Sequence, residues 1–413
     1  MRPIPEGRLF FSACPYGPNP HGPREWCSGK GALPEPTPQP PGIGPEVYFR
    51  SSGETGSTRL THNEIGEFGL RWSPDGKLVS LSGSPDRVNP GECGLYIMRP
   101  SSGKITNIIE PREYSCTFTT EWSPSSKRFS FLNFYYDGPI SLFTVLPNGN
   151  DAGCLTPNYW NDAQAAQSPQ WSSRHRVLFH DGNSIVSVNA LGNNRRRLVK
   201  HWSLDDFALS PTRRTIAYSA TSQRRDFSSV EMYLIDPDGS DKRRLTENRR
   251  VESEPTWSPD GSRLAFTSVG FNHGGVARLM VLGRGGELKR YRIPRSTEPT
   301  YDPVWSPDGS RIAFMSRPHE NRDKRKAWVI SARTGKIRSI EVPKDITLHQ
   351  DPYYDFVVVP PDLIWSPSGE YLAFEAYNDD YEFAGFAARP GGTAFRVTPF
   401  SQLTPGNLLL AWR

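Results

Sequence analysis

Short apolar runs alternate with polar turns along the whole chain. Between residues 254 and 294, an apolar stretch ends at Trp257, a tight polar turn follows, and RLAFTS, ARLMVLG and LKRYRIP are three further runs. Runs of about four to eight residues bounded by Gly, Pro, Asp and Ser are typical of β-strands. Apolar positions with helical spacing are absent from this segment, which therefore predicts four short antiparallel strands, called a to d.

The same unit recurs and is marked by a tryptophan–serine pair. The sequence WSPDG occurs at 72–76, 257–261 and 305–309. A period of about 40–50 residues with four strands per unit is typical of a β-propeller blade. Aligning the units on this pair gives eight positions, 38 to 60 residues apart: Trp72, Trp122, Trp171, Leu209, Trp257, Trp305, Trp365 and Trp412.

SPDG has the residues of a tight turn between strands a and b. Proline presets φ at the second turn position, aspartate bonds the local backbone, and glycine takes the left-handed position. The preceding tryptophan is a large flat group suited to packing between neighbouring blades. We therefore interpret WSPDG as architectural.

The chain ends predict how the ring closes. RLFFSA, at 8–13, matches strand b rather than strand a, and the missing strand a is NLLLAW at 407–412. We therefore predict one all-β domain over 1–413, an eight-bladed propeller of four-stranded antiparallel blades. Its first blade joins 8–62 to 406–413, which removes an open sheet edge. A seven-bladed ring is the alternative, and unit 166–200 is the weakest.

These motifs resemble a known repeat. WSPDG followed by an (I/L)-A-F strand, and DPDGSDKRRLT at 236–246, are similar to the TolB-type β-propeller repeat. The resemblance implies the fold over nearly the whole chain. It leaves function open, because this repeat also occurs in propellers that precede prolyl-oligopeptidase-type hydrolases and in lyase-like propellers. The N-terminal α/β domain of TolB itself is not expected here.

Two kinds of connection predict two different faces of the ring. The a–b and c–d connections are short and share one face, whereas the b–c and d–a connections are long and share the other, here called the long-loop face. Long loops on a rigid ring are the usual functional surface. The loop at 344–362 is the best candidate for recognition. The predicted binding residues are His349, Asp351, Tyr353, Tyr354, Asp355, Trp160, Trp202, Tyr377 and Tyr381.

All five cysteines lie in the first 154 residues. Cys14 and Cys27 bracket half of a Pro/Gly-rich insertion at 14–45, and Cys93 and Cys116 are both placed near the long-loop face. Two disulfides, Cys14–Cys27 and Cys93–Cys116, are therefore predicted, with reduced cysteines as the alternative. Cys154 is left over as a thiol in strand d. Bridges imply a periplasmic or secreted protein, in a mature form because the N-terminus has no signal-peptide h-region.

Composition narrows the classes of function. The hydrophobic content of 36% supports a sizeable core, and no run of 18 apolar residues predicts a membrane span. The net charge is only +5, and the basic clusters fall in different repeats. Nucleic-acid binding would need one basic stripe with stacking aromatics. We therefore expect a protein partner or an extracellular glycan and no nucleic acid, with the oligomeric state left open.

Sequence signatures of catalysis are sparse. GxSxG, P-loop and HExxH motifs are absent. We therefore predict a non-catalytic binding scaffold without a cofactor, although a divalent metal in the central channel stays open. The alternative is a lyase-like propeller that cleaves acidic glycans with His, Tyr and Arg at the channel mouth. Its candidate groups are His273, His319, His349, Tyr353, Tyr354 and Arg317.

Overall fold

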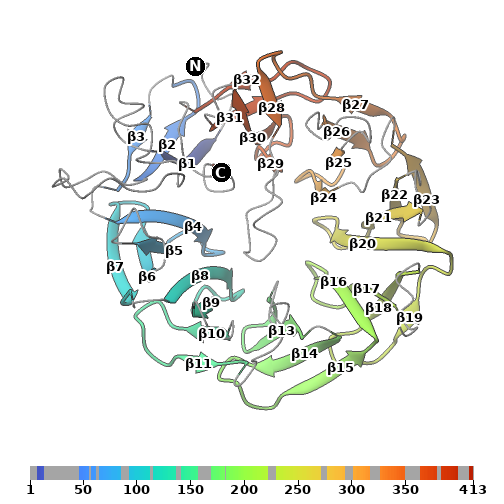
Figure 1. Cartoon of the computed structure of the whole chain (residues 1–413), viewed down its shortest axis with the longest axis horizontal. Helices are drawn as coiled ribbons and strands as arrows, with labels where there is room; N and C mark the ends of the chain where they lie inside the picture. The colour runs from blue at the N-terminus through green and yellow to red at the C-terminus, as the bar shows by residue number, and fades with distance from the viewer. Residues whose placement is uncertain are drawn as a thin grey trace, which may run out of the picture.

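A computed structural model gives the fold, and every regular element in its described part is a β-strand (Figure 1). Within that part, no helix is long and apolar enough to cross a membrane. The described residues are 7–13, 46–54, 57–61, 65–84, 93–111, 115–135, 141–156, 169–181, 183–221, 229–270, 277–293, 301–316, 326–348, 363–378, 383–398 and 409–412.

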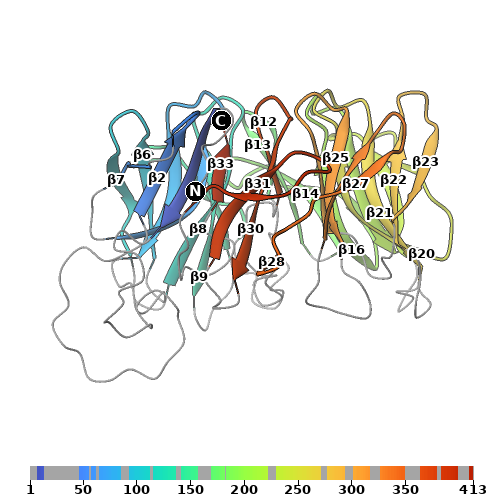
Figure 2. The same ribbon diagram turned by 90° about the horizontal axis from the view of Figure 1, so that it is seen from above.

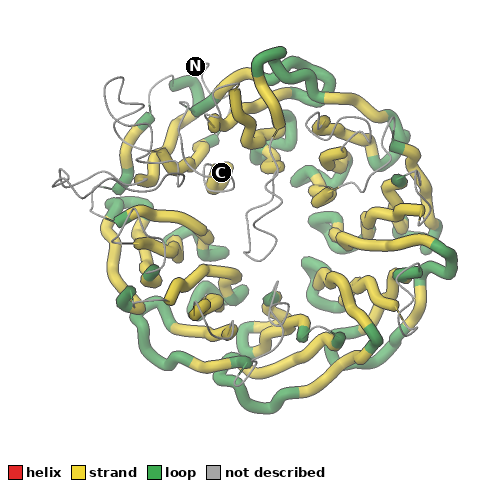
Figure 3. Tube along the Cα trace, viewed as in Figure 1, coloured by secondary structure: helices red, strands yellow, loops and turns green. Residues whose placement is uncertain are grey.

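The strands form antiparallel sheets arranged in a ring, here numbered 1 to 8 in chain order (Figures 1 and 3). Sheet 1 contains β1 (Arg8–Ala13), β2 (Glu46–Ser51), β3 (Thr58–Arg59) and β33 (Leu409–Trp412). Sheet 2 contains β4 (Gly66–Trp72), β5 (Val79–Ser84), β6 (Gly94–Arg99) and β7 (Lys104–Ile109). Sheet 3 contains β8 (Ser115–Trp122), β9 (Phe129–Tyr135), β10 (Ser141–Val145) and β11 (Gly153–Cys154). Sheet 4 contains β12 (Gln170–Ser173), β13 (Arg176–His180), β14 (Ser184–Asn189) and β15 (Arg196–Lys200).

The second half of the ring repeats this order. Sheet 5 contains β16 (Ser203–Leu209), β17 (Ile216–Thr221), β18 (Glu231–Ile235) and β19 (Arg243–Arg244). Sheet 6 contains β20 (Arg250–Trp257), β21 (Leu264–Gly270), β22 (Arg278–Leu282) and β23 (Leu288–Arg292). Sheet 7 contains β24 (Tyr301–Trp305), β25 (Arg311–Ser316), β26 (Lys326–Ser331) and β27 (Ile337–Ser339). Sheet 8 contains β28 (Ile346–Leu348), β29 (Leu363–Trp365), β30 (Leu372–Asn378), β31 (Phe383–Ala388) and β32 (Phe395–Arg396).

Seven of the sheets are four-stranded blades, which is the number of blades in the seven-bladed alternative. Sheet 8 departs from the four-stranded pattern. The prediction of eight four-stranded blades is wrong at this point, because β28 and β29 pair with two different parts of β30. The cause is the spacing of 60 residues between Trp305 and Trp365, the longest in the chain. The loop predicted at 344–362 consequently begins with a strand, whereas the weak unit at 166–200 forms a regular sheet 4.

The predicted closure of the ring is confirmed. β33 pairs with β1, with Leu9 opposite Trp412 and Phe10 opposite Ala411. The N-terminal sheet is therefore completed by the last strand of the chain, and the two ends of the described chain share one sheet (Figure 1). This pairing covers an edge that would otherwise be open to aggregation.

The core consists of apolar layers between neighbouring sheets. Between sheets 5 and 6, Met232 and Leu234 on β18 pack with Leu264 and Phe266 on β21 and with Met280 on β22. Similar layers join the other neighbours around the ring. The sheets therefore hold one another in place, and residues at the ends of strands are positioned on a rigid frame.

The WSPDG turns close as predicted, along the edge of the ring that carries the short turns (Figure 2). The Ser73 hydroxyl donates to Asp75 Oδ1 (2.8 Å), and the Gly76 amide donates to the Ser73 carbonyl (2.9 Å). Gly76 has φ of 71°, a conformation that favours glycine. The same hydroxyl–carboxylate bond recurs at Ser258–Asp260 and Ser306–Asp308.

At five sheet junctions of the described part, the tryptophan of the signature joins a sheet to the one before it. Its indole N–H donates to a backbone carbonyl on the first strand of the preceding sheet. The large apolar ring is thus packed between sheets while its polar atom is hydrogen-bonded. The donors and acceptors are Trp122 to Arg71 (2.9 Å), Trp171 to Glu121 (3.1 Å), Trp257 to Ala208 (3.0 Å), Trp305 to Thr256 (3.1 Å) and Trp365 to Val304 (3.1 Å).

Leu209 replaces this tryptophan in sheet 5, and a glutamine of sheet 4 takes over the link. The side-chain amide of Gln170 donates to the Phe207 carbonyl (3.0 Å) and accepts from the Leu209 amide (2.6 Å). The junction between sheets 4 and 5 therefore keeps its polar contact without an indole.

A threonine after strand d fastens the outer edge of four sheets. In sheet 5, the Met232 amide donates to the Thr246 hydroxyl oxygen (2.9 Å). This contact explains why the RRLT sequence ends in threonine, since the hydroxyl continues the ladder where strand d stops. The equivalent pairs are Val47–Thr61 (2.8 Å), Leu142–Thr156 (2.8 Å) and Gly385–Thr398 (2.7 Å).

Candidate functional site

The strongest candidate among the described residues is the seam between sheets 5 and 6 at their long-loop ends, formed by 229–231, 244–252 and Ser268. Backbone contacts fix it: the Val230 amide donates to the Arg250 carbonyl (3.0 Å), and the Glu252 amide donates to the Val230 carbonyl (2.9 Å). The start of β18 is therefore held against the start of β20, and their polar side chains meet.

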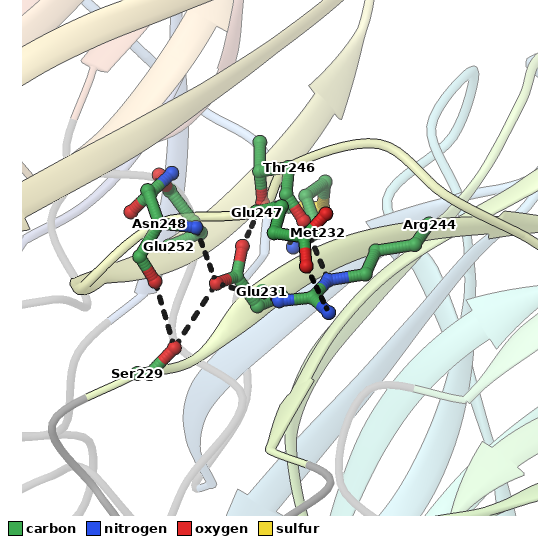
Figure 4. A network of polar contacts seen from close by, with 8 residues as sticks. All are labelled: Ser229, Glu231, Met232, Arg244, Thr246, Glu247, Asn248 and Glu252. Atoms are coloured by element: carbon green, nitrogen blue, oxygen red, sulfur yellow. Dashed lines mark hydrogen bonds and ion pairs between the residues drawn. The ribbon is translucent and has the colours of Figure 1, made fainter.

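Glu231 is a buried carboxylate with every contact supplied by this seam (Figure 4). Its Oε2 accepts the Thr246 hydroxyl (2.6 Å), and its Oε1 accepts the Asn248 amide (2.8 Å) and the Ser229 hydroxyl (3.0 Å). The Arg244 guanidinium lies 3.1 Å from Oε1. Such complete pairing offsets the desolvation of a buried charge.

Glu252 lies beside Glu231, and fewer hydrogen bonds offset the burial of its carboxyl group. Its side chain is fully buried, and its Oε1 accepts the side-chain amide of Asn248 (2.9 Å; Figure 4). Burial raises the pKa of Glu252 to about 7, against the opposing effects of Asn248, Ser268 and Arg250, and the Glu231 charge raises it further. This carboxyl group can therefore gain or lose a proton near neutral pH, a property that is common at functional sites.

Arg250 begins β20 and faces the same seam. Its Nε donates to the Ser268 hydroxyl (2.7 Å), and its Nη2 donates to the Ser268 carbonyl (2.8 Å). These two bonds hold the guanidinium over β21 at the end of sheet 6. The seam thus holds a fixed cation whose charge acts on the buried carboxyl group of Glu252.

Charged groups also line the innermost strands of the ring. Enclosure by the ring raises the pKa of Glu121, which the charges of Arg71 and Arg213 oppose. Asp205 shows the same upward pKa shift for the same reason, opposed by His180. Both carboxyl groups are nevertheless exposed to solvent, as expected for side chains in the central channel. The channel can therefore hold charge, but no described group of three or more His, Cys, Asp or Glu is placed to bind a metal ion.

One described cluster combines histidine, tyrosine and lysine. His201 Nε2 lies 3.3 Å from the Tyr218 hydroxyl and 3.2 Å from Lys242 Nζ, and its ring is 5.0 Å from that of Tyr233. Burial and the Lys242 charge lower the pKa of His201 to about 4. Because Tyr218 is fully buried, a substrate could not reach its hydroxyl, and this cluster acts as packing within sheet 5.

The structure places two of the nine predicted binding residues. Trp202 precedes β16 and is 58% exposed, and Tyr377 is half-buried on β30 opposite Thr347. They belong to sheets 5 and 8, which are not neighbours in the ring (Figure 1). The other seven lie outside the described residues: His349, Asp351, Tyr353, Tyr354, Asp355, Trp160 and Tyr381. The same holds for the lyase candidates His273, His319 and Arg317.

The cysteines are placed in part. Cys93 is buried, and the Thr117 hydroxyl donates to its carbonyl (3.4 Å). Cys116 belongs to β8, but its side chain, like all of Cys14 and Cys27, lies outside the described residues. Cys154 on β11 is a free thiol, as predicted, and its partial burial raises its pKa.

The seam was missed by sequence reasoning. Glu231 and Glu252 are separated by a whole turn and strand and lie on different sheets. The available signal was a glutamate at the start of an apolar strand, VEMYLI at 230–235, and another in RVESEPTW at 250–257. An acidic residue at such a position requires a partner when it is buried.

Comparisons with known proteins agree with the fold. Residues 151–326 match a family model described as the TolB beta propeller domain. An uncharacterized protein of Agrobacterium fabrum strain C58, Atu1656, is 26% identical over 235 residues, covering 52% of this chain and 72% of that protein. A protein TolB homolog of Chlorobium luteolum is 38% identical over 55 residues, covering 13% of this chain and 12% of that protein.

Two solved structures have a similar overall shape. An oligogalacturonate lyase in complex with manganese has a TM-score of 0.53 at 13% identity, covering 94% of this chain and 98% of that chain. One from a study of two prolyl endopeptidases has a TM-score of 0.52 at 12% identity, covering 94% of this chain and 54% of that chain. At this identity the likeness shows the fold alone.

Proposed function

We propose that this TolB-like β-propeller is a non-catalytic binding protein that recognises a protein partner or a glycan through its long-loop face. The proposal starts from the repeat, which the family model and the fold both support. A closed ring of sheets is a rigid support, and binding residues on such a support lose little entropy on association.

The observation that carries the proposal is the exposure of Trp202 on this face. It is 58% exposed, whereas the signature tryptophans Trp122, Trp171, Trp305 and Trp365 are buried. Lys200 and Arg249, on the same face, are exposed as well. Exposed tryptophan and arginine are the residues that most often dominate binding energy at interfaces. The other predicted binding residues are part of the same proposal: His349, Asp351, Tyr353, Tyr354, Asp355, Trp160, Tyr377 and Tyr381.

A lyase acting on acidic glycans is the alternative. It needs reachable His, Tyr and Arg groups that converge at the channel mouth. In the described His–Tyr–Lys cluster around His201, the tyrosine that histidine contacts, Tyr218, is fully buried, so this cluster does not supply a reachable acid. Incubation of the protein with oligogalacturonate and manganese should therefore release no unsaturated sugar product; such a product would favour the alternative.

We also propose an extracytoplasmic location, with Cys93–Cys116 and Cys14–Cys27 bridged. The contact between Thr117 and the Cys93 carbonyl supports the first pair, because Thr117 is the neighbour of Cys116 in the chain. Thiol titration of the unfolded, unreduced protein should then find one free cysteine, Cys154. Five free thiols would contradict both bridges and the location drawn from them.

The binding proposal is tested by substitution of the exposed tryptophan. Partners captured from extracellular extract by the full chain are identified, purified and titrated against the wild type and Trp202→Ala. We expect Trp202→Ala to weaken binding about tenfold or more, as at interface hot spots. Leu191→Ala, at a 46% exposed residue on a short turn, is the control and should change nothing. Equal affinity of wild type and Trp202→Ala would refute the site.

A further inference from the structure

A row of arginines crosses sheet 6 at its long-loop end. Ser268 on β21 pairs with Arg278 on β22, and Arg278 pairs with Arg292 on β23. Arg250 on β20 reaches the same row, because its guanidinium donates to Ser268. Directly paired residues of neighbouring strands project from the same face of a sheet. The three arginines therefore share one face.

This face of sheet 6 is the one that meets sheet 5. Arg290 lies two residues before Arg292 and so projects from the same face, since side chains alternate along a strand. It pairs with Met280, which packs with Met232 and Leu234 of sheet 5. The arginine row is therefore defined as Arg250, Arg278, Arg290 and Arg292, and it borders the seam.

The described residues balance the positive charge of the arginine row only in part. The side chains of Arg278 and Arg290 form no hydrogen bond or ion pair with the described residues. Burial lowers the pKa of Arg250, the charges of Arg278 and Arg290 lower it further, and the charge of Glu252 opposes them. Of the two nearby carboxyl groups, Glu231 is already paired with Arg244. Glu252 is fully buried and bonded to Asn248. A ligand that brings negative charge would relieve the repulsion among the guanidinium groups.

We propose that the arginine row binds an acidic segment of a partner protein, a run of aspartate and glutamate side chains. This proposal rests on the binding function of the long-loop face. Planar guanidinium groups form paired hydrogen bonds with carboxylates, and strands about 4.8 Å apart present them as a regular series. Sugar rings commonly add stacking on an exposed aromatic to any charge pairing, and no described residue on this face of β20–β23 is an exposed aromatic. The chemistry therefore favours a peptide over a glycan.

The test is a titration of the full chain with a fluorescent peptide of alternating aspartate and glutamate. A peptide of asparagine and glutamine with the same length is the neutral control, and oligogalacturonate is the glycan control. The double variant R278Q/R290Q removes two guanidinium groups. Lys289→Gln is the matched control, because Lys289 is exposed on the same strand but pairs with Val281, so that its side chain projects from the opposite face.

We expect the acidic peptide to bind, with an affinity that falls as salt is raised. R278Q/R290Q should weaken binding about tenfold or more, whereas Lys289→Gln should stay within about twofold. Arg290→Gln alone, at an exposed residue, should keep the fold and weaken binding about threefold. Equal binding of the neutral peptide, equal losses in R278Q/R290Q and Lys289→Gln, or arginine-dependent binding of oligogalacturonate alone would each overturn the proposal. If Trp202→Ala weakens the binding of a purified partner and R278Q/R290Q does not, the binding function stands and the acidic-segment site is wrong.

Discussion

The two faces of the ring use polar residues in opposite ways. On the short-turn face, Ser73 and Asp75 bond each other and the turn backbone, and the indoles of five signature tryptophans, Trp122 among them, bond the preceding sheet. At the seam on the long-loop face, Glu252 is buried with a perturbed pKa and Arg278 has no partner among the described residues. Polar groups that satisfy one another build the fold, whereas groups left with unbalanced charge remain available to a ligand. The contrast is the reason for taking the seam as the candidate site.

The largest expected effect belongs to the architectural side. Trp305 is buried, donates to the Thr256 carbonyl (3.1 Å) and packs under the Arg263 guanidinium, 4.8 Å from the ring centroid. Trp305→Ala should lower the free energy of unfolding by about 3–5 kcal/mol, because it opens a cavity between sheets 6 and 7. Denaturant unfolding measures this. Trp202→Ala should lower the free energy of unfolding by less than about 1 kcal/mol. Similar losses for both substitutions would contradict the difference between the two faces.

A smaller effect is expected at the seam, and it should depend on pH. The folded-state pKa of Glu252, about 7, lies above its ordinary value of 4.5. The folded state therefore binds the proton more tightly than the unfolded state. The contribution of Glu252 to stability is then full below the unfolded-state pKa and is lost as pH rises through about 7.

Glu252→Gln tests this by keeping the shape and removing the charge. It should change stability little at about pH 5 and raise it by about 1–3 kcal/mol at about pH 8, relative to wild type. Urea unfolding at both pH values is the measurement. Glu247→Gln is the control in the same segment, since its side chain is 86% exposed, and it should show no such trend. A stabilisation that is largest at acidic pH would contradict the sign argued for Glu252.

Sequence predicted the repeat better than it predicted the seam. WSPDG, the threonine of RRLT and the unpaired strand at 8–13 are local signals, because turn chemistry and strand patterning act over a few residues. The split of the innermost strand of sheet 8 into β28 and β29 was missed, since two three-residue strands carry almost no pattern. Glu231 and Glu252 were missed because their meeting depends on how two sheets dock. Trp202 was found because the register of the repeat places it between strands d and a, at the long-loop face, although its connection has only two residues.

The smallest effect is expected where the architecture itself departs from its rule. At the junction of sheets 4 and 5, Gln170 replaces an indole link with bonds to Phe207 (3.0 Å) and Leu209 (2.6 Å). Gln170→Ala should therefore lower the free energy of unfolding by about 1–2 kcal/mol, since it removes two hydrogen bonds and leaves backbone groups without them. Ser173→Ala, at the end of the same strand, should cost less than about 0.5 kcal/mol. Denaturant unfolding compares the two variants, and equal losses would mean that the Gln170 amide does not stabilise the junction of sheets 4 and 5.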